Sequence, residues 1–452
     1  MRFADLPSAT PFAPHRTAER LDPYWDGVWQ FGSHAQWVSR EHLERLERAG
    51  LAGRRPAALR ADPAVASARI GADWDAKLDL LGQLSGWRTV TAEQAAAFNG
   101  ASVSSAQHRR VIADLFALEL IDAGAIGAAL GGPQAARGRM LRPSASKAFD
   151  RLIKPRLSYA EWVSVTGGLK FLTGGQYDRH NVLTTELGLR VSEFLRVGTV
   201  LGERQAHVNT LAYTSVGLPE PPGRSQQTAD AVIVRHDGVR IAVELTASVG
   251  TSGFQRKAEM WARLLERRAY DDTGLVVVFI VADRAAGAVT DRNNGGLHLT
   301  VRKQVARAAR LYPGTSLNRT ADRMFVIDWR DWFPARGEAS DDFLRLRAQR
   351  PTGTQGEWIP ADLLDEFDVP APTRMHDPLA VIRNSSGLRS VPEHIREMNP
   401  SRPPLHVLSL RRSGYGKLKQ VRVNPRTGEV RKSTGRARGS APRVTIPERL
   451  RY

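Results

Sequence analysis

Three residues of the types used in phosphodiester cleavage lie close together between Thr228 and Trp261. Asp230 precedes the apolar run AVIVR, Glu244 follows the run VRIAV, and Lys257 lies in the next segment. Carboxylate oxygens are donors that Mg²⁺ prefers, and a nearby ammonium group can offset charge developing on a phosphate. The trio predicts a catalytic site in which Asp230 and Glu244 bind Mg²⁺, or Mn²⁺, while Lys257 supports the attacking water.

The geometry of this trio depends on the turn between the two apolar runs. Alternating apolar residues, rich in Val and Ile, predict a strand in each run. The connection His236-Asp237-Gly238 suits a three-residue hairpin loop, with Gly238 in the left-handed conformation. This register sets Asp230 opposite Glu244 on one face, with Cβ atoms about 5 Å apart. A two-residue loop would shift the register by one and place the carboxylates on opposite faces.

Lys257 belongs to a segment with helical periodicity that begins near Phe254. An apolar stripe at helical spacing predicts the buried face, with Lys257 on its flank. The residues of the stripe are Phe254, Ala258, Trp261, Leu265 and Ala269. From this flank the ammonium group could reach the two carboxylates.

The order of these parts resembles the PD-(D/E)XK nuclease superfamily. There a helix precedes a hairpin carrying Asp and Glu-x-Lys, and a helix and further strands follow. This chain has Thr246 where the motif has Lys. Some branches place the lysine on the following helix, and Lys257 is the candidate for that position. The alternative is an ordinary surface pair, because acids at the ends of strands are common.

Composition bounds the classes of protein to which the chain can belong. The 452 residues carry a formal net charge of +18, which favours a polyanionic partner, with nucleic acid as the first choice. There is no cysteine, so disulfides and thiolate metal sites are excluded. No apolar run reaches the ~18 residues of a membrane span, and the N-terminus lacks a signal-peptide pattern. We therefore expect a cytoplasmic protein with no membrane association.

Residues 71–148 have the pattern of a winged helix-turn-helix domain. Three predicted helices, with a turn near Asn99-Gly100, are followed by a basic two-stranded wing. Ser102 or Ser104 is the expected N-cap of the third helix, whose first turns would face the major groove. The alternative is a helical bundle that contacts another protein. The predicted DNA contacts are Ser104, Gln107, His108 and Arg110 on that helix and Arg137, Arg139 and Arg142 on the wing.

Residues 149–335 are expected to form the PD-(D/E)XK restriction-endonuclease-like, mixed-sheet α/β domain. The segment from His180 to Gly198 predicts an amphipathic helix, on which Glu186 or Glu193 could join the site, although both are typical solvated helix residues. LVVVFIVADR predicts a buried central strand, a basic helix follows, and MFVIDWRDWF predicts the last strand.

The two ends of the chain carry weaker patterns. Residues 1–70 suggest a helical extension, including a helix between the N-cap Ser39 and Gly50. Residues 336–452 suggest a linker followed by a basic region, because positions 401–452 hold 14 Lys/Arg against 2 Glu. Such a region would bind phosphates without sequence preference, or remain a solvated terminus. The DNA contacts expected in it are Arg411, Arg412, Lys417 and Lys419.

Over roughly residues 72–335 the chain resembles the replication-relaxation family of actinobacterial plasmids and mobile elements. The resemblance rests on a winged helix, a helix opening with His-Asn-x-Leu, the acidic hairpin, and Lys257-x-x-x-Trp261. In that family the hairpin Glu is usually followed by x-Asp, where this chain has Leu245-Thr246. The resemblance implies DNA binding in plasmid replication, transfer or topology control. A Mg²⁺-dependent endonuclease or nickase, an inactive nuclease-fold DNA-binding factor, and a non-DNA adaptor all remain open.

Overall fold

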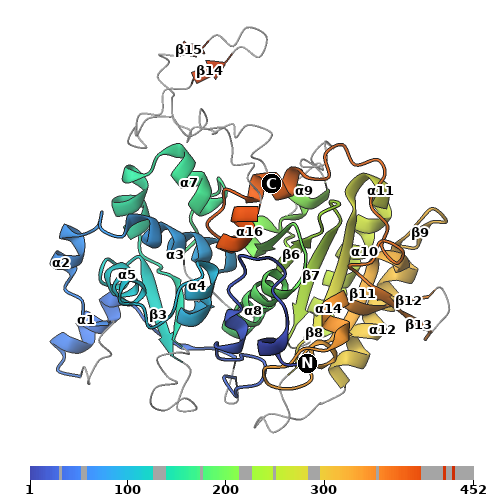
Figure 1. Cartoon of the computed structure of the whole chain (residues 1–452), viewed down its shortest axis with the longest axis horizontal. Coiled ribbons are helices and arrows are strands. Elements are labelled where there is room, and N and C mark those ends of the chain that lie inside the picture. The colour runs from blue at the N-terminus through green and yellow to red at the C-terminus, as the bar shows by residue number, and fades with distance from the viewer. Residues whose placement is uncertain are drawn as a thin grey trace.

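The protein is a mixed α/β chain built on a seven-stranded sheet, as a computed structural model shows (Figure 1). The structure describes residues 1–29, 33–51, 59–125, 139–173, 177–212, 227–247, 251–283, 296–352 and 356–398, and the backbone of 421–423 and 430–432. Within these residues, no helix is both long and apolar enough to cross a lipid bilayer.

The large sheet combines antiparallel edges with a parallel centre. Its strands, in spatial order, are β13 (Trp358–Asp362), β12 (Arg347–Pro351), β11 (Met324–Asp328), β8 (Leu275–Val281), β7 (Arg240–Thr246), β6 (Ala231–Val234) and β5 (Thr199–Gly202). Strands β5, β6 and β7 are antiparallel neighbours, whereas β7, β8 and β11 are parallel. The predicted central strand is confirmed as β8, which is buried along its whole length.

Helices cover both faces of this sheet. α8 (Asp178–Phe194) packs on one face, while α10 (Thr251–Arg267) and α12 (Gly296–Leu311) pack on the other. Successive side chains of β8 point to opposite faces of the sheet and pack in both layers. Val276 and Val278 face α8, while Val277 and Phe279 face α10 and α12. α10 and α12 connect parallel strands, as such crossovers require.

A second, smaller sheet lies in the N-terminal part of the chain. It has the order β1-β3-β4-β2, formed by β1 (Gln36–Val38), β3 (Ile121–Ala125), β4 (Met140–Pro143) and β2 (Val90–Thr91). Around it lie α3 (Trp74–Trp87), α4 (Ala92–Phe98) and α5 (Ala106–Ala117). A capping box of Thr91 and Gln94 begins α4. The side chain of Ser105, rather than the predicted Ser102 or Ser104, caps α5.

The remaining α-helices and strands of the described residues are short. They are α1 (Arg40–Arg48), α2 (Pro63–Ala68), α7 (Tyr159–Thr166), α9 (Val208–Ala212), α11 (Tyr270–Thr273), β9 (Gly314–Thr315), β10 (Asn318–Arg319), α13 (Trp329–Trp332), α14 (Asp341–Arg345), α15 (Ala380–Ser385), α16 (Glu393–Met398), β14 (Val421–Val423) and β15 (Val430–Lys432). Ser39 caps α1 as expected.

Three expectations about the elements were wrong. α8 is not amphipathic, because all of its residues except His180 are buried. β11 is not the last strand, because β12 and β13 extend the same sheet beyond residue 335. The segment after Ala339 is not a linker throughout, because Phe343, Val381 and Ile395 lie in the core.

Candidate active site

The predicted hairpin brings Asp230 and Glu244 face to face. Ala231 pairs with Val243 and Val234 with Arg240, so the same register sets Asp230 opposite Glu244. Gly238 adopts φ +94°, and its N–H donates to the carbonyl of Arg235 at 3.0 Å. The predicted three-residue turn is thereby confirmed, and with it the shared face on which the site depends.

Lys257 joins this pair from α10. Its ammonium contacts Glu244 Oε2 and lies 3.7 Å from Asp230 Oδ2. The Nε1–H of Trp261, one turn further along α10, donates to Glu244 Oε1 at 2.6 Å. The backbone N–H of Leu245 donates to Asp230 Oδ2 at 2.7 Å. The structure therefore brings together all three residues that the sequence assigned to the site.

The site is closed at its base and open at its rim. The Glu244 side chain is 0% exposed, Asp230 is 12% exposed and Lys257 is 34% exposed. A phosphate approaching from solvent would meet the lysine before either carboxylate. A fully buried carboxylate carries a large desolvation cost unless it is paired or protonated.

Burial and neighbouring charges shift the pKa values of the two carboxyl groups in opposite directions. Burial, together with the negative charge of Asp230, raises the pKa of Glu244 to about 8. Burial acts against ionisation of Asp230 as well, but the charges of His180 and Lys257 outweigh it and hold the pKa of Asp230 below its ordinary value. Burial would lower the pKa of Lys257, yet the two acids raise it. Asp230 is the ionised member of the pair and Glu244 the group that retains a proton.

His180 is a fourth member that the sequence did not assign. Its Nε2 lies 2.9 Å from Asp230 Oδ1, and the side chain is 22% exposed. His180 projects from the first turn of α8. Its neighbour Arg179 donates to the carbonyls of Ala282 and Asp283, which follow β8, and so holds this turn in place. The sequence signal was the His-Asn-x-Leu opening of this helix, which does not specify the partner of the histidine.

The donor chemistry fits a divalent cation held by Asp230 and Glu244. Both offer oxygen atoms, and Glu244 Oε2 is buried without a hydrogen-bond partner, so its contact is the ammonium of Lys257. Among the described residues, however, no three His, Cys, Asp or Glu side chains group as a metal site would. The chain thus offers two carboxylates, and any remaining positions would fall to water or phosphate.

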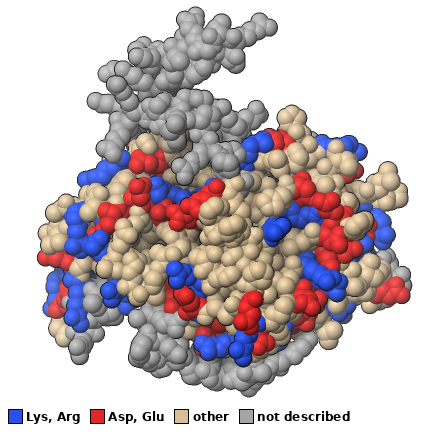
Figure 2. Space-filling view, viewed as in Figure 1, with Lys and Arg blue, Asp and Glu red and all other residues tan. Residues whose placement is uncertain are grey.

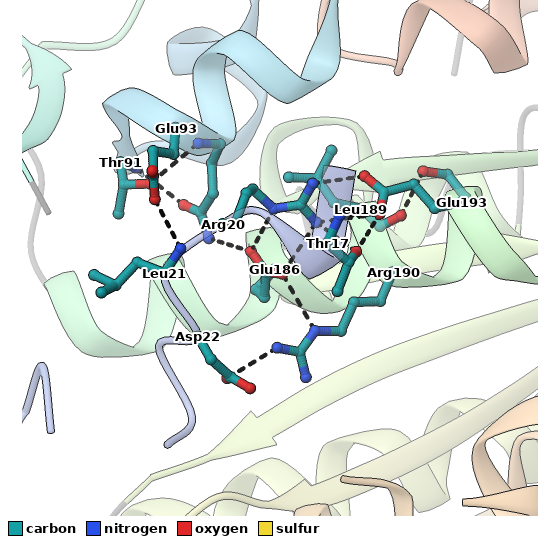
Figure 3. A network of polar contacts seen from close by, with 12 residues as sticks. Thr17, Arg20, Leu21, Asp22, Thr91, Glu93, Glu186, Leu189, Arg190 and Glu193 are labelled. Atoms are coloured by element: carbon teal, nitrogen blue, oxygen red, sulfur yellow. Dashed lines mark hydrogen bonds and ion pairs between the residues drawn. The ribbon is translucent and has the colours of Figure 1, made fainter. Parts of the chain in front are cut away.

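The other acids considered for this site lie elsewhere. Arg20 lies between Glu186 and Glu193, at 3.0 Å and 2.6 Å from their carboxylates (Figure 3). Arg190 lies 3.2 Å from Glu186 and 2.8 Å from Asp22. The expectation that Glu186 and Glu193 are solvated was wrong, because both are buried within this network.

The predicted DNA contacts on α5 differ in accessibility. Ser104, Gln107 and Arg110 are exposed, and the latter two bond to Asp73. His108 is directed inward, with Nε2 2.9 Å from the carbonyl oxygen of Ala92, and burial lowers its pKa. Its ring nitrogen is thus engaged within the protein, and its contact with DNA stays a prediction.

The predicted wing residues are only partly described. Arg139 is half-buried next to β4. Arg142 pairs with Asp122 at 3.2 Å and lies 4.2 Å over the ring of Trp37, so it is engaged within the protein. The remaining predicted contacts lie outside the described residues; they are Arg137, Arg411, Arg412, Lys417 and Lys419.

Comparisons with known proteins add no relative: no family model, curated protein or solved structure matches the chain. Fold and site define the class as a mixed α/β protein with an acid pair joined by a lysine at one end of its central strands.

Proposed function

We propose that the protein binds DNA and cuts or nicks it through a PD-(D/E)XK nuclease-like domain with Mg²⁺ or Mn²⁺ as cofactor. The observation that carries this proposal is the convergence of Asp230, Glu244 and Lys257 at a partly open site. The resemblance to the replication-relaxation family suggests a role in plasmid or mobile-element replication or transfer.

The order of elements supports the nuclease-like part of the proposal. α8 precedes the antiparallel strands β5, β6 and β7, and α10 then crosses to the parallel strand β8. A helix, an acidic hairpin, a lysine helix and a further strand follow one another as the superfamily pattern expects. In the N-terminal part, α3, α4, α5 and the β3–β4 pair have the order of a winged helix.

The chain's own residues have distinct roles in this mechanism. His180 and the Leu245 N–H orient Asp230, while Trp261 fixes Glu244. The ammonium of Lys257, whose side chain is partly exposed, would offset negative charge on the phosphate in the transition state. A divalent ion held by Asp230 and Glu244 would supply a Lewis acid and an activated water.

Incubation with supercoiled plasmid tests the proposal. With Mg²⁺ or Mn²⁺ the wild type should give nicked or linear DNA, and Glu244→Ala and Lys257→Met should each lose about 100-fold or more in rate. Glu259→Ala is the matched control, since Glu259 lies on α10 but bonds to Gln255. If all four proteins gave the same amount of product with and without metal, the proposed nuclease activity would be refuted.

The second candidate is a DNA-binding factor whose nuclease-like domain does not cut. Two observations favour it: Thr246 stands where the motif has Lys, and Lys257 already bridges both carboxylates. Binding of duplex DNA without any metal-dependent product would select this candidate.

A further inference from the structure

The outer surface of α10 and α12 carries an excess of positive charge that the proposed chemistry does not use. Six exposed cations project from these two helices: Arg256, Arg263, Arg267, Lys303, Arg307 and Arg310. On α10 the arginines recur at helical spacing, and on α12 the same holds for the lysine and its two arginines. We name these six residues the α10–α12 basic face.

The two rows lie side by side. α10 and α12 pack against each other on the same face of the sheet, as Figure 1 shows. Both helices run antiparallel to the parallel strands that they connect, so the rows run in the same direction. The α10 row extends about 16 Å and the α12 row about 10 Å along the helix axes. Packed helix axes are about 8–10 Å apart, so the rows form one patch.

The acids of the described residues neutralise only part of the positive charge of this patch. Within the described residues, the five cations other than Arg263 make no ion pair, and Arg263 bonds to the hydroxyl of Tyr312 at 2.6 Å. α12 contains no acid, and on α10 only Glu259 and Glu266 oppose the row. Elsewhere exposed arginines commonly face an acid, as Arg374 faces Asp272 at 3.0 Å.

The charge pattern fits the backbone of a DNA duplex. Duplex DNA carries one negative charge per ~1.7 Å of its axis with both strands counted, so a length of about 16 Å of duplex holds about nine phosphates, of which those on the facing side can meet the patch. On the face shown in Figure 2, basic and acidic side chains are interspersed. The two helices carry six exposed cations but only three exposed large apolar side chains, so an ionic partner fits better than an apolar one. The apolar side chains are Met260, Leu299 and Leu311.

The position of the patch links it to the candidate active site. Arg256, at one end of the α10 row, directly precedes Lys257, whose ammonium contacts Glu244. A duplex bound along α10 would therefore lie next to Asp230 and Glu244. We infer that the α10–α12 basic face binds the phosphate backbone of the duplex next to the site, an inference that rests on the proposed DNA-binding function and deepens it.

Salt-dependent binding of the full chain to a duplex tests this inference, with EDTA present so that cleavage plays no part. Lys303→Gln/Arg307→Gln removes two charges from α12, and Arg256→Gln/Arg267→Gln removes two from α10. Each variant should lower the slope of log affinity against log salt by about 2, and weaken binding more than tenfold near 0.1 M salt. All four side chains are exposed, so thermal unfolding should match wild type.

The control is Arg345→Gln/Arg374→Gln, which removes the same charge from two arginines paired with Asp362 and Asp272. If both variants show the same slope of log affinity against log salt as this control, the α10–α12 basic face does not bind DNA, whatever the plasmid assay shows. A wild type that binds no duplex at low salt would overturn it as well. Metal-dependent plasmid cleavage judges the proposed active site separately, because it compares Glu244→Ala with wild type and not the charge variants.

Discussion

Glu244 is an acid whose charge the surrounding protein disfavours. Its pKa, raised to about 8 by burial and by Asp230, exceeds the ordinary value of 4.5, so the folded chain binds a proton that the unfolded chain releases between those values. The contribution of Glu244 to the free energy of unfolding should therefore be largest below about pH 4.5 and should fall as pH rises toward 8. Asp230 and Lys257 are shifted outside this window.

Glu244→Gln should remove this dependence, because a neutral amide mimics the protonated acid. One proton corresponds to a slope of at most about 1.4 kcal/mol per pH unit. Urea unfolding in EDTA between about pH 5 and 8 measures it. Wild type should lose stability relative to the variant as pH rises, and two parallel curves would show that Glu244 ionises normally.

His180 should matter for cleavage rather than for folding. It holds Asp230 Oδ1 at 2.9 Å, and groups that orient a metal-binding carboxylate typically contribute 10–100-fold to affinity or activity. His180→Ala should lower the metal-dependent nicking rate by about that factor, and the melting temperature should fall only slightly, because Lys257 and the Leu245 N–H still contact Asp230. His42→Ala, on exposed α1, is the control. A variant as active as wild type would exclude His180 from the site.

At the scale of elements, α8 depends on the N-terminal segment for charge neutralisation. Arg20 is buried and contacts both Glu186 and Glu193 (Figure 3). Arg20→Ala would leave two carboxylates buried in excess of the remaining positive charge, a change that costs about 3–5 kcal/mol. Chemical unfolding of the full chain measures the loss.

A surface pair nearby provides the comparison. Arg16 and Glu19 form an exposed ion pair in the same N-terminal segment, so Arg16→Ala should cost at most about 1 kcal/mol. Adding Glu186→Gln and Glu193→Gln to Arg20→Ala should restore part of the lost stability, because no charge is then left unpaired. If Arg20→Ala and Arg16→Ala destabilise equally, the network has no special role in holding α8.

Elements with local signals were the ones that sequence could predict. The hairpin register followed from three turn residues, and β8 followed from an unbroken apolar run. α8 was misjudged because its charged residues were assigned to solvent. Their partner, Arg20, lies more than 160 residues away in a segment with no periodic pattern. β12 and β13 were missed because Arg347, Arg350 and Pro360 interrupt the apolar alternation that marks strands.

The candidate site was predictable to the same extent. Asp230, Glu244 and Lys257 converge because a hairpin and the next helix are local in sequence. His180 lies 50 positions before Asp230, and no spacing rule links a lone histidine to a distant acid. Pairing of Arg142 with Asp122 and Trp37 was equally invisible, so an arginine assigned to DNA is engaged within the protein.

At the scale of the whole molecule, the N-terminal part and the large sheet pack as one body. One apolar core includes Leu84 and Phe116 from the first and Leu187 and Val278 from the second. Trp37 of the small sheet donates from Nε1 to Asp178 Oδ2 at 3.0 Å, at the start of α8. Asp178 lies two residues from His180, so this contact reaches the edge of the candidate active site.

Close backbone approach makes this interface sensitive to a single methyl group. A Cβ at Gly202 on β5 would lie 2.6 Å from the carbonyl oxygen of Gly86 on α3, a backbone atom that cannot turn aside. Gly202→Ala should therefore destabilise the protein by about 1–3 kcal/mol. Gly253→Ala on α10 has open space and should be neutral or stabilise by up to about 1 kcal/mol.

The same substitution tests whether the two parts unfold together. If the interface contributes to the stability of both, Gly202→Ala should speed the exchange of the slowest amide hydrogens in α5 and in β8 alike, since both exchange through global opening. Mass spectrometry of exchanged peptides from each element measures this. Faster exchange in α5 with β8 unchanged would instead show that the N-terminal part unfolds on its own, and that contacts across Trp37 and Asp178 do not tie it to the site.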